Sequence, residues 1–429
     1  MSGGKGSHDR KKVVCLVSPA QVSYNPRLVK EADALAGAGY DVHVVGCLLE
    51  EEKTRLDREL VAESDWSFHP VQARRGYSLP DHSRWLYASL RQALYRRLPW
   101  LCRTEWGGAR AYGRYVDELA KMAMEIDADL YIAHNLQALP AASWAAKKQE
   151  ARLGFDAEDF HRGQFSPDER GSLKGRLTRT VEEQCIPECD YVTAASPGIG
   201  AAYAEELDIE PPTSILNVFP KEERDQNLPE GARGQERPDD GNTISLYWYS
   251  QVIGHDRGLQ DAVRALGHLN EYVHLSLRGE WEEGFRDELR RIAEKEEVSH
   301  RVHRLEPVPP EELVARAGLH DIGLALEQAH SPNRDLCITN KILAYLLAGL
   351  PVVATETEGQ EHVHKKAPGV VRLCEIGSPE ALAERVIELT ATEATLESAH
   401  ERAWQVGEER LNWEKEQKKL VDTISAVLW

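Results

Sequence analysis

The stretch Thr339-Asn-Lys-Ile-Leu-Ala-Tyr-Leu-Leu-Ala-Gly-Leu-Pro-Val-Val-Ala-Thr355 carries the signals that decide the fold. Its first part has the apolar periodicity of a helix, and Gly349 stands where a helix C-cap calls for a left-handed backbone. The apolar run from Pro351 to Ala354 predicts a buried strand directly afterwards. A helix followed closely by a buried strand is the repeating unit of a parallel α/β sheet.

The same alternation runs along most of the chain. Further strands are predicted at 12–17, 41–46, 129–134, 190–195, 243–250, 273–279 and 321–326. Asn25-Pro26 and Ser196-Pro197 each place an N-cap residue before a first-turn proline, which predicts helix starts. We therefore expect an α/β protein of two doubly wound, Rossmann-like domains.

A charged interval separates the two sets of strands. Residues 221–241 hold 11 charged residues, two prolines and three glycines, which is typical of a solvated linker. The expected division is a polar tail at 1–11, a first domain at 12–220, the linker at 221–241, a second domain at 242–405 and a C-terminal helix at 406–429. Because that helix carries large apolar residues, we expect it to pack back on the first domain.

Composition excludes several classes of protein. The 429 residues include 52 Lys and Arg against 71 Asp and Glu, a net charge of −19 that argues against a nucleic-acid partner. The sequence has neither an apolar run of membrane-spanning length nor an apolar signal core at its start. Seven scattered cysteines without a C-x-x-C pair predict a reducing, cytoplasmic location and no metal site. The first strand–helix turn, residues 18–26, lacks the glycines of dinucleotide and P-loop motifs.

Five segments together resemble glycosyltransferase family 4 and its relatives, which have the GT-B fold. The segments are 25–31, 129–135, 154–159, 249–259 and 339–355, and the resemblance extends from about residue 12 to residue 425. It implies two Rossmann-like domains facing a cleft, the first for the acceptor and the second for the donor. It also implies a retaining transferase that uses a nucleoside-diphosphate sugar, with no permanently bound cofactor and no metal.

The chemistry of such a donor fits two predicted helix starts. Charge develops on the departing diphosphate, and a helix N-terminus stabilises it with free N–H groups and a positive dipole end. Lys341 lies in a first helical turn, where a cation is disfavoured by roughly 0.3–1 kcal/mol unless an anion binds. Arg257-Gly258 repeats this arrangement before Leu259. We therefore predict a diphosphate site formed by Thr339, Asn340, Lys341, Arg257 and Gly258.

The sequence departs from the family pattern at the nucleotide site. The family's Glu-x7-Glu pair would fall at Leu336 and Ala344, and neither is acidic. Glu327, just after a predicted strand, is the nearest acid that could replace the lost contact to sugar or ribose. An arginine of the family pattern is Val252 here, and we expect Arg278 to substitute for it at the phosphates.

Candidate residues of the first domain follow its predicted strands. The resemblance implies that His134 contacts the sugar or the donor. The carboxylates of Asp156, Glu158 and Asp159 could bind acceptor hydroxyls or accept a proton, although acids in a loop also form ordinary solvated turns. Asn25 and Arg27 lie on the first loop, where Asn25 is also a plain N-cap. The predicted catalytic residues are His134, Glu327 and Asp156, and the predicted acceptor residues are Asn25, Arg27, Glu158 and Asp159.

The segment 84–114 runs against the acidic background with seven arginines, one acid and six aromatic residues. Leucines at 86, 90, 94 and 98 form an apolar stripe at helical spacing. One interpretation is an amphipathic helix at an anionic membrane surface or a lipid-linked acceptor. The other is a helix whose leucines pack on the first domain while its arginines face water.

The leading hypothesis is a retaining glycosyltransferase in the cytoplasm or at the inner face of the membrane. Its partners would be a nucleotide sugar and an acceptor that is a glycan, a lipid-linked glycan or a small molecule. Because the two family glutamates are missing, a non-catalytic GT-B protein that binds sugar nucleotides or glycans is the alternative. A sugar-nucleotide epimerase or hydrolase on the same fold is the third hypothesis.

Overall fold

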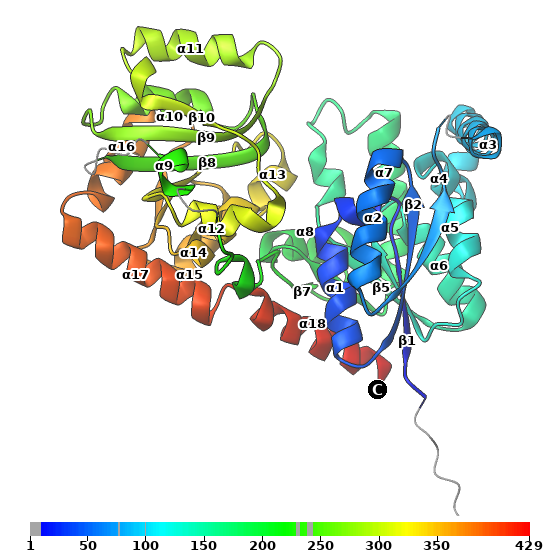
Figure 1. Ribbon diagram of the computed structural model, residues 1–429. Helices are drawn as coiled ribbons and strands as arrows, with labels where there is room; N and C mark the ends of the chain where they lie inside the picture. Colours follow the sequence, from blue (N-terminus) through cyan, green and yellow to red (C-terminus); the bar gives the residue numbers. More distant parts are fainter. Residues whose placement is uncertain (1–9, 76–77, 99, 229–231, 238–242) are drawn as a thin grey trace, which may run out of the picture. The chain divides into compact units, whose positions relative to one another are not determined.

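The computed structural model describes residues 10–75, 78–98, 100–228, 232–237 and 243–429. Its chain forms two compact units (Figure 1). Unit 1 contains the chain up to Ile215 together with Gln417–Trp429, and unit 2 contains Leu216–Glu416. Nearly all of the predicted polar tail, and parts of the predicted linker, lie outside the described residues.

Unit 1 is built on a seven-stranded parallel sheet with the order β3-β2-β1-β4-β5-β6-β7. Its strands are β1 (Val13–Val17), β2 (Asp41–Leu48), β3 (Ser67–Gln72), β4 (Leu130–His134), β5 (Arg152–Ala157), β6 (Tyr191–Ala194) and β7 (Thr213–Ser214). Its helices are α1 (Pro26–Gly37), α2 (Glu51–Glu63), α3 (Leu79–Arg97), α4 (Glu105–Tyr112), α5 (Val116–Ala123), α6 (Leu139–Gln149), α7 (Leu173–Cys185) and α8 (Pro197–Leu207). Helices α1 and α2 lie on one side of the sheet and α5 and α6 on the other (Figure 1).

Unit 2 repeats this plan with a six-stranded parallel sheet in the order β10-β9-β8-β11-β12-β13. Its strands are β8 (Ile244–Ile253), β9 (Val273–Trp281), β10 (Val302–Leu305), β11 (Ile322–Ala325), β12 (Val352–Thr355) and β13 (Val371–Cys374). Its helices are α9 (Ala232–Glu236), α10 (Leu259–Leu266), α11 (Phe285–Lys295), α12 (Leu313–Ala317), α13 (Pro332–Leu336), α14 (Asn340–Ala348), α15 (Glu358–Lys366), α16 (Pro379–Leu389) and α17 (Glu393–Glu409). Two doubly wound sheets confirm the predicted Rossmann-like fold.

Local sequence signals explain where the predicted elements begin and end. Helices cover both faces of each sheet, so every residue of central strands such as β1 and β12 is buried, and apart from Thr355 at the end of β12 all of them are apolar. Asn25 and Ser196 accept hydrogen bonds from the first turns of α1 and α8, each with proline at the first helical position. Gly349 ends α14 with φ +82°, the left-handed C-cap that the sequence predicts.

The C-terminal segment contains two helices where the sequence predicts one. Helix α17 belongs to unit 2, and α18 (Trp413–Leu428) follows after a short break. The second half of α18 packs on unit 1, where Lys419 Nζ donates to the carbonyl of Ser214 at 2.8 Å and the hydroxyls of Tyr40 and Ser425 lie 2.8 Å apart. The prediction that the C-terminal helix packs back on the first domain is therefore confirmed.

The packing of α17 on α14 gives a stability prediction at Gly407. A Cβ atom there would lie 2.6 Å from the carbonyl oxygen of Leu346 and 2.7 Å from Cα of Leu347. Because both atoms belong to backbone, Gly407→Ala must push the helices apart, and we expect a loss of about 1–3 kcal/mol in the free energy of unfolding. Chemical denaturation measures it.

Gly37→Ala is the matched control, because a Cβ at Gly37 has no described heavy atom within 4 Å. That variant should be neutral or slightly stabilising, since alanine is the better helix former. Equal stability of the two variants would contradict the close approach of α14 and α17.

Candidate functional site

The carboxyl edge of the unit 1 sheet brings three polar side chains into one row. His134 ends β4, Asp156 lies near the end of β5, and Thr193 lies on β6. The strand register pairs His134 with Asp156 and Asp156 with Thr193. All three side chains are buried, and the Thr193 hydroxyl donates to Asp156 at 2.7 Å. This is the edge at which doubly wound sheets bind ligands.

Helix α1 adds a guanidinium to this row. Asn25 caps the helix by accepting from the N–H of Leu28 at 2.9 Å, and this places Arg27 in the first turn. The Arg27 guanidinium donates to both oxygens of Asp156 at 2.6 and 2.7 Å and to the carbonyl of Ile215 at 2.7 Å. Paired ionised groups of this geometry make strong hydrogen bonds, so Arg27 ties α1 to β5 and to the segment after β7.

Charge around His134 makes it a buried cation. Its Nε2 lies 3.1 Å from a Glu31 oxygen, and its Nδ1 lies 3.5 Å from Asp156 and 3.7 Å from Glu158. Burial lowers the pKa of His134, but the carboxylates of Glu31, Glu158 and Asp156 outweigh that effect and raise it to about 10. For Asp156 the effects are reversed: burial alone would raise its pKa, but the positive charges of Arg27 and His134 lower it. The imidazole is therefore protonated at neutral pH.

The structure thus brings together four of the residues predicted for the first domain. Arg27, His134, Asp156 and Glu158 form one cluster. His134 and Asp156 have no exposed surface, so in this conformation neither touches solvent, and contact of either with a sugar stays a prediction. Glu158 is partly exposed, as are Asn25 and Asp159.

Glu31 belongs to the cluster, and sequence reasoning did not single it out. It lies one helical turn after Arg27, so the i,i+4 spacing on α1 was the signal that could have found it. The oxygens and nitrogens of Glu31, His134 and Asp156 lie close enough together to hold a metal ion. A metal there would have to displace the proton of His134 and compete with Arg27, so the predicted absence of a metal stays a prediction.

In unit 2, two helix starts meet the end of β11. Gly258 precedes α10 with φ +68°, and a Cβ atom there would lie 2.7 Å from Cβ of Leu326 and 2.8 Å from its carbonyl oxygen. Only glycine fits this backbone and this close approach. Glu327 follows directly and contacts the start of α14, so α10 and α14 both begin against the segment 326–328.

Glu327 organises the start of α14. Its Oε1 accepts from the Thr339 hydroxyl at 3.0 Å and from Lys341 Nζ at 2.8 Å. Ser or Thr hydroxyls cap α13, α15, α16 and α17 of this unit, but the Thr339 hydroxyl makes no such bond to α14. Because Thr339 is turned to Glu327, no described side chain caps the first N–H groups of α14. These donors point to an anion site.

Electrostatics keep the carboxyl group of Glu327 ionised. Burial raises the pKa of Glu327, but Lys341, Thr339 and Arg334 outweigh it and lower the pKa below its usual range. Arg334, on α13, lies 3.6 Å from Glu327 and is half exposed; the sequence analysis did not name it. Arg257 is partly exposed and lies beyond 4.0 Å of every described carboxylate. The cations in contact with Glu327 are therefore Lys341 and Arg334.

Arg278 is engaged elsewhere, although the sequence predicts a phosphate contact for it. Its nitrogens donate to the Tyr247 hydroxyl at 2.8 Å, to the carbonyl of Glu306 and to Glu236. Glu236 lies on α9, within the predicted linker, and is only 2% exposed. Burial would raise its pKa, but His320, Arg278 and Arg316 lower it to about 2. A phosphate could reach Arg278 only by displacing Glu236.

The two positions of the missing glutamates lie beside this site. Leu336 ends α13, and Ala344 is buried in α14 one turn after Lys341. Neither position carries a carboxylate. The acid in contact with Lys341 is instead Glu327.

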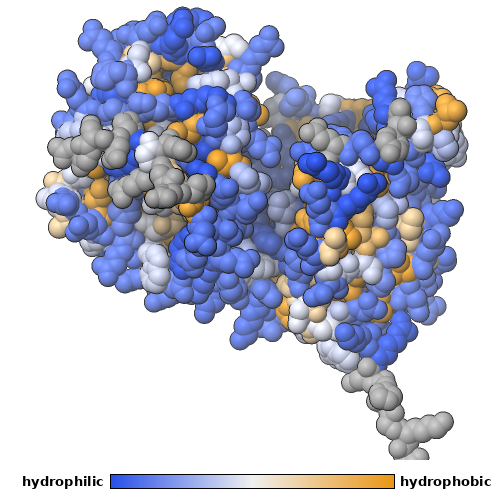
Figure 2. Space-filling model, viewed as in Figure 1, coloured by the Kyte–Doolittle hydropathy of each residue, from blue (hydrophilic) through white to orange (hydrophobic). Residues whose placement is uncertain are grey.

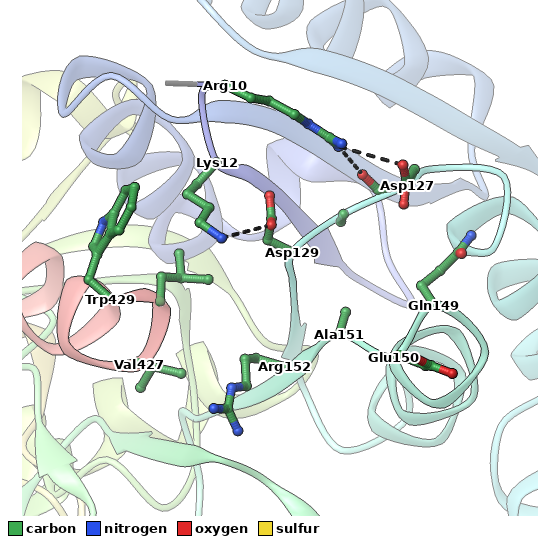
Figure 3. A pocket seen from close by; sticks show the side chains of 12 residues that line it. Arg10, Lys12, Asp127, Asp129, Gln149, Glu150, Ala151, Arg152, Val427 and Trp429 are labelled. Carbon is green, nitrogen blue, oxygen red and sulfur yellow. Dashed lines mark hydrogen bonds and ion pairs between the residues drawn. The ribbon is translucent and has the colours of Figure 1, made fainter. Parts of the chain in front are cut away.

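A surface pocket of unit 1 lies at the opposite edge of the sheet (Figure 3). It is lined by residues before β1 and β4 and by the C-terminal Trp429. Lys12 lies 3.0 Å from Asp129, and Arg10 lies 3.5 Å from Asp127. Because these charges neutralise one another at the amino ends of the strands, we do not assign the donor to this pocket.

Comparison with known proteins follows the same division into two units. Residues 24–215 match the family model described as glycosyl transferase 4-like domain, and residues 245–392 match glycosyl transferases group 1. The chain therefore belongs to the glycosyltransferase 4-like family, with the GT-B fold. A search of curated proteins finds no match to this sequence.

Solved structures of GT-B proteins are similar over nearly the whole chain. Anabaena HepE in complex with UDP is 16% identical with a TM-score of 0.69, covering 97% of this chain and 100% of that one. Sucrose-phosphate synthase from Thermosynechococcus elongatus is 13% identical with a TM-score of 0.66, covering 97% and 99%. WaaG, a glycosyltransferase involved in lipopolysaccharide biosynthesis, is 15% identical with a TM-score of 0.59, covering 95% and 98%. At these identities the likeness shows the fold.

The charge of His134 can be tested through the pH dependence of stability. A folded-state pKa of about 10 lies above the ordinary value, so the stabilisation is fully present below about pH 6.5 and is lost as the pH rises to about 10. His134→Gln should cost on the order of 3–5 kcal/mol near pH 6, and the difference from the natural protein should shrink steadily towards pH 10. Chemical denaturation at several pH values measures it.

His255→Gln is the control for this experiment. His255 also lies between two carboxylates, Glu282 and Glu288, but its side chain is 45% exposed, so its loss should change stability little. A difference for His134→Gln that stays constant from pH 6 to pH 10 would show that the imidazole is neutral.

Proposed function

We propose that this protein is a retaining glycosyltransferase that moves a sugar from a nucleoside-diphosphate sugar to an acceptor. The observation that carries the proposal is the start of α14, where the Thr339 hydroxyl is turned to Glu327 and leaves the helix N–H groups uncapped. Lys341 lies in the first turn of α14, and Arg257 lies just before the start of α10. Membership in the family supports the same reaction.

The proposed site stabilises the leaving diphosphate. As the bond from sugar to phosphate breaks, negative charge grows on the bridging oxygen, and backbone N–H groups with a nearby ammonium oppose it at fixed positions. Lys341 is held ready by Glu327 at 2.8 Å. An incoming diphosphate would share Lys341 with Glu327, and Asn340, which is exposed, would be the next polar side chain on its path.

The donor is proposed to be a nucleotide sugar that needs no metal, because helix N–H groups and two cations can supply the charge that a metal would otherwise provide. HepE in complex with UDP supports a uridine nucleotide. Glu327 is the proposed contact to the sugar or ribose. In a front-face displacement the acceptor attacks from the side on which the diphosphate leaves, which retains the configuration without a protein nucleophile.

Unit 1 is proposed to hold the acceptor. Asn25, Glu158 and Asp159 are partly exposed near the carboxyl edge of its sheet, where they could accept hydrogen bonds from hydroxyl groups. The buried pair of Arg27 and Asp156 and the cation His134 would fix the position of Glu158. A glycan, a lipid-linked glycan or a small molecule fits this chemistry, and the likeness to WaaG, a glycosyltransferase involved in lipopolysaccharide biosynthesis, supports a role in glycoconjugate or polysaccharide biosynthesis. The proposed location is the cytoplasm.

Thermal unfolding with UDP, GDP, ADP, dTDP and their common sugars tests the donor. A ligand at 100 times its dissociation constant should add about 2.7 kcal/mol of stability, and we expect one base to do so equally with and without EDTA. Radiolabelled donor then reports release of the sugar, and NMR of the anomeric proton reports retention.

Each other outcome of this experiment has a defined meaning. A stabilising nucleotide without sugar release to any acceptor would favour the non-catalytic alternative. A changed sugar nucleotide in the absence of acceptor would favour an epimerase. Stabilisation by none of the nucleotides would refute the donor site.

Lys341 can be tested separately. Lys341→Gln removes the cation and leaves Glu327 to repel the diphosphate, so nucleotide affinity measured by calorimetry should fall about 10- to 100-fold, or roughly 1.4–2.8 kcal/mol. Lys341→Arg, which keeps the charge, should lose much less. Lys365→Gln on α15 of the same unit, where the side chain is 72% exposed, is the control and should bind like the natural protein. Equal affinity of Lys341→Gln and Lys365→Gln would remove Lys341 from the site.

A further inference from the structure

Helix α3 turns its apolar residues outward. Its bounds are Leu79–Arg97, and the exposed fractions are 88% for Leu79, 44% for Leu86, 62% for Leu90 and 56% for Leu94. At 100° per residue these four positions share one face of the helix. Of the predicted stripe, Leu98 is partly buried, but the interpretation in which the leucines pack on the first domain is wrong for Leu86, Leu90 and Leu94.

Polar residues occupy the inward face of the same helix. The buried residues of α3 are the polar Asp81 and Gln92 together with the small Ala88. The Asp81 carboxylate lies 3.8 Å from the Arg74 guanidinium, and the Gln92 amide donates to the carbonyl of Tyr112 at 3.0 Å. Buried polar groups that are paired in this way cannot be exchanged for the leucines by a simple rotation of the helix. The helix is fixed with its apolar face in solvent.

Aromatic residues extend this face. Tyr87 is 64% exposed, and Trp100 is 67% exposed just beyond the helix. The space-filling view shows an apolar patch over α3 (Figure 2). Large exposed apolar side chains that gather in one place mark interaction sites. We define the α3 face as Leu79, Leu86, Tyr87, Leu90, Leu94 and Trp100.

Several arginines lie on α3 and on the segments that follow it. Arg91 and Arg110 pair with the acids of α5. In contrast, the exposed residues Arg96, Arg97, Arg103 and Arg114 lie beyond 4.0 Å of every carboxylate among the described residues. The whole chain has a net charge of −19, whereas this group of arginines makes the local charge positive. Its partner must combine an apolar interior with an anionic surface.

We propose that the α3 face docks on a lipid bilayer that carries anionic phospholipids. Leucines enter the boundary between headgroups and acyl chains, tryptophan and tyrosine lie at the interface, and the arginines bind phosphate groups around them. Among the described residues no helix is both long enough and apolar enough to span a bilayer. The contact is therefore a peripheral one, and it does not rest on the proposed transferase function.

Charge complementarity favours a bilayer over a protein partner. A stable protein interface has an apolar centre from which charged residues are depleted. Here the unpaired arginines border a single row of leucines along one helix, which is the distribution found on helices that lie in a membrane surface. A second copy of this chain would bring its own arginines against these, and the like charges would repel.

Sedimentation with vesicles tests the proposal on the full-length protein. We expect binding to vesicles of phosphatidylcholine with 30% phosphatidylglycerol, at least tenfold weaker binding to phosphatidylcholine alone, and weaker binding as the salt concentration rises. The double variant Leu90→Glu/Leu94→Glu and the double variant Arg97→Glu/Arg103→Glu should each reduce binding to the anionic vesicles at least tenfold.

Matched controls lie on unit 2. Ile387→Glu changes a residue that is 50% exposed, and Arg290→Glu changes an arginine whose side chain is 67% exposed; both should bind as the natural protein does. Circular dichroism and thermal unfolding check that each variant is folded. Failure of the natural protein to bind anionic vesicles would overturn the proposal. Self-association that Leu90→Glu/Leu94→Glu abolishes, without any vesicle binding, would also overturn it and make the face an interface between copies.

Discussion

The bidentate ion pair between Arg27 and Asp156 holds unit 1 together at its functional edge. Through it α1 is bound to β5, and the same two side chains contact Thr193 on β6 and the carbonyl of Ile215. Burying two charges is costly unless their remaining donors and acceptors are satisfied. Here the Thr193 hydroxyl and the Ile215 carbonyl take part in this, and His134 adds a second cation 3.5 Å from Asp156. The edge of the sheet is thereby a fixed charged surface, in which Glu158 is the carboxylate that reaches solvent.

At the carboxyl edge of the unit 2 sheet, a charged pair leaves the start of a helix without a side-chain cap. Glu327 takes the hydroxyl of Thr339 that would otherwise cap α14, and it holds Lys341 in a turn where the helix dipole disfavours a cation. The helix N–H groups are left for a ligand, and an anion bound there would turn an unfavourable dipole interaction into a favourable one. The first N–H groups of α14 therefore lack a cap from the Thr339 side chain, whereas the Asp156 carboxylate of unit 1 is already hydrogen-bonded to Arg27 and Thr193.

The fold was predictable where signals are local. Asn25-Pro26, Ser196-Pro197 and Gly349 each fix an element by the chemistry of neighbouring residues. Short edge strands such as β7, with two residues, carry no such pattern. Arg278 shows the limit at the site, because Glu236 engages it from 42 positions away, and a pairing over that distance in the chain leaves no periodic trace.

Helix α3 shows the same limit more sharply. The spacing of its leucines predicts an amphipathic helix but not which face is buried, since both faces can make favourable contacts. The choice is made by tertiary hydrogen bonds, above all those of Gln92 to the carbonyls of Ala111 and Tyr112. With the leucines facing solvent, the net charge of the chain also affects how the α3 face meets a membrane. A protein with a net charge of −19 is repelled by an anionic surface except where its arginines gather, so the α3 face would also set the orientation in which unit 1 approaches a membrane.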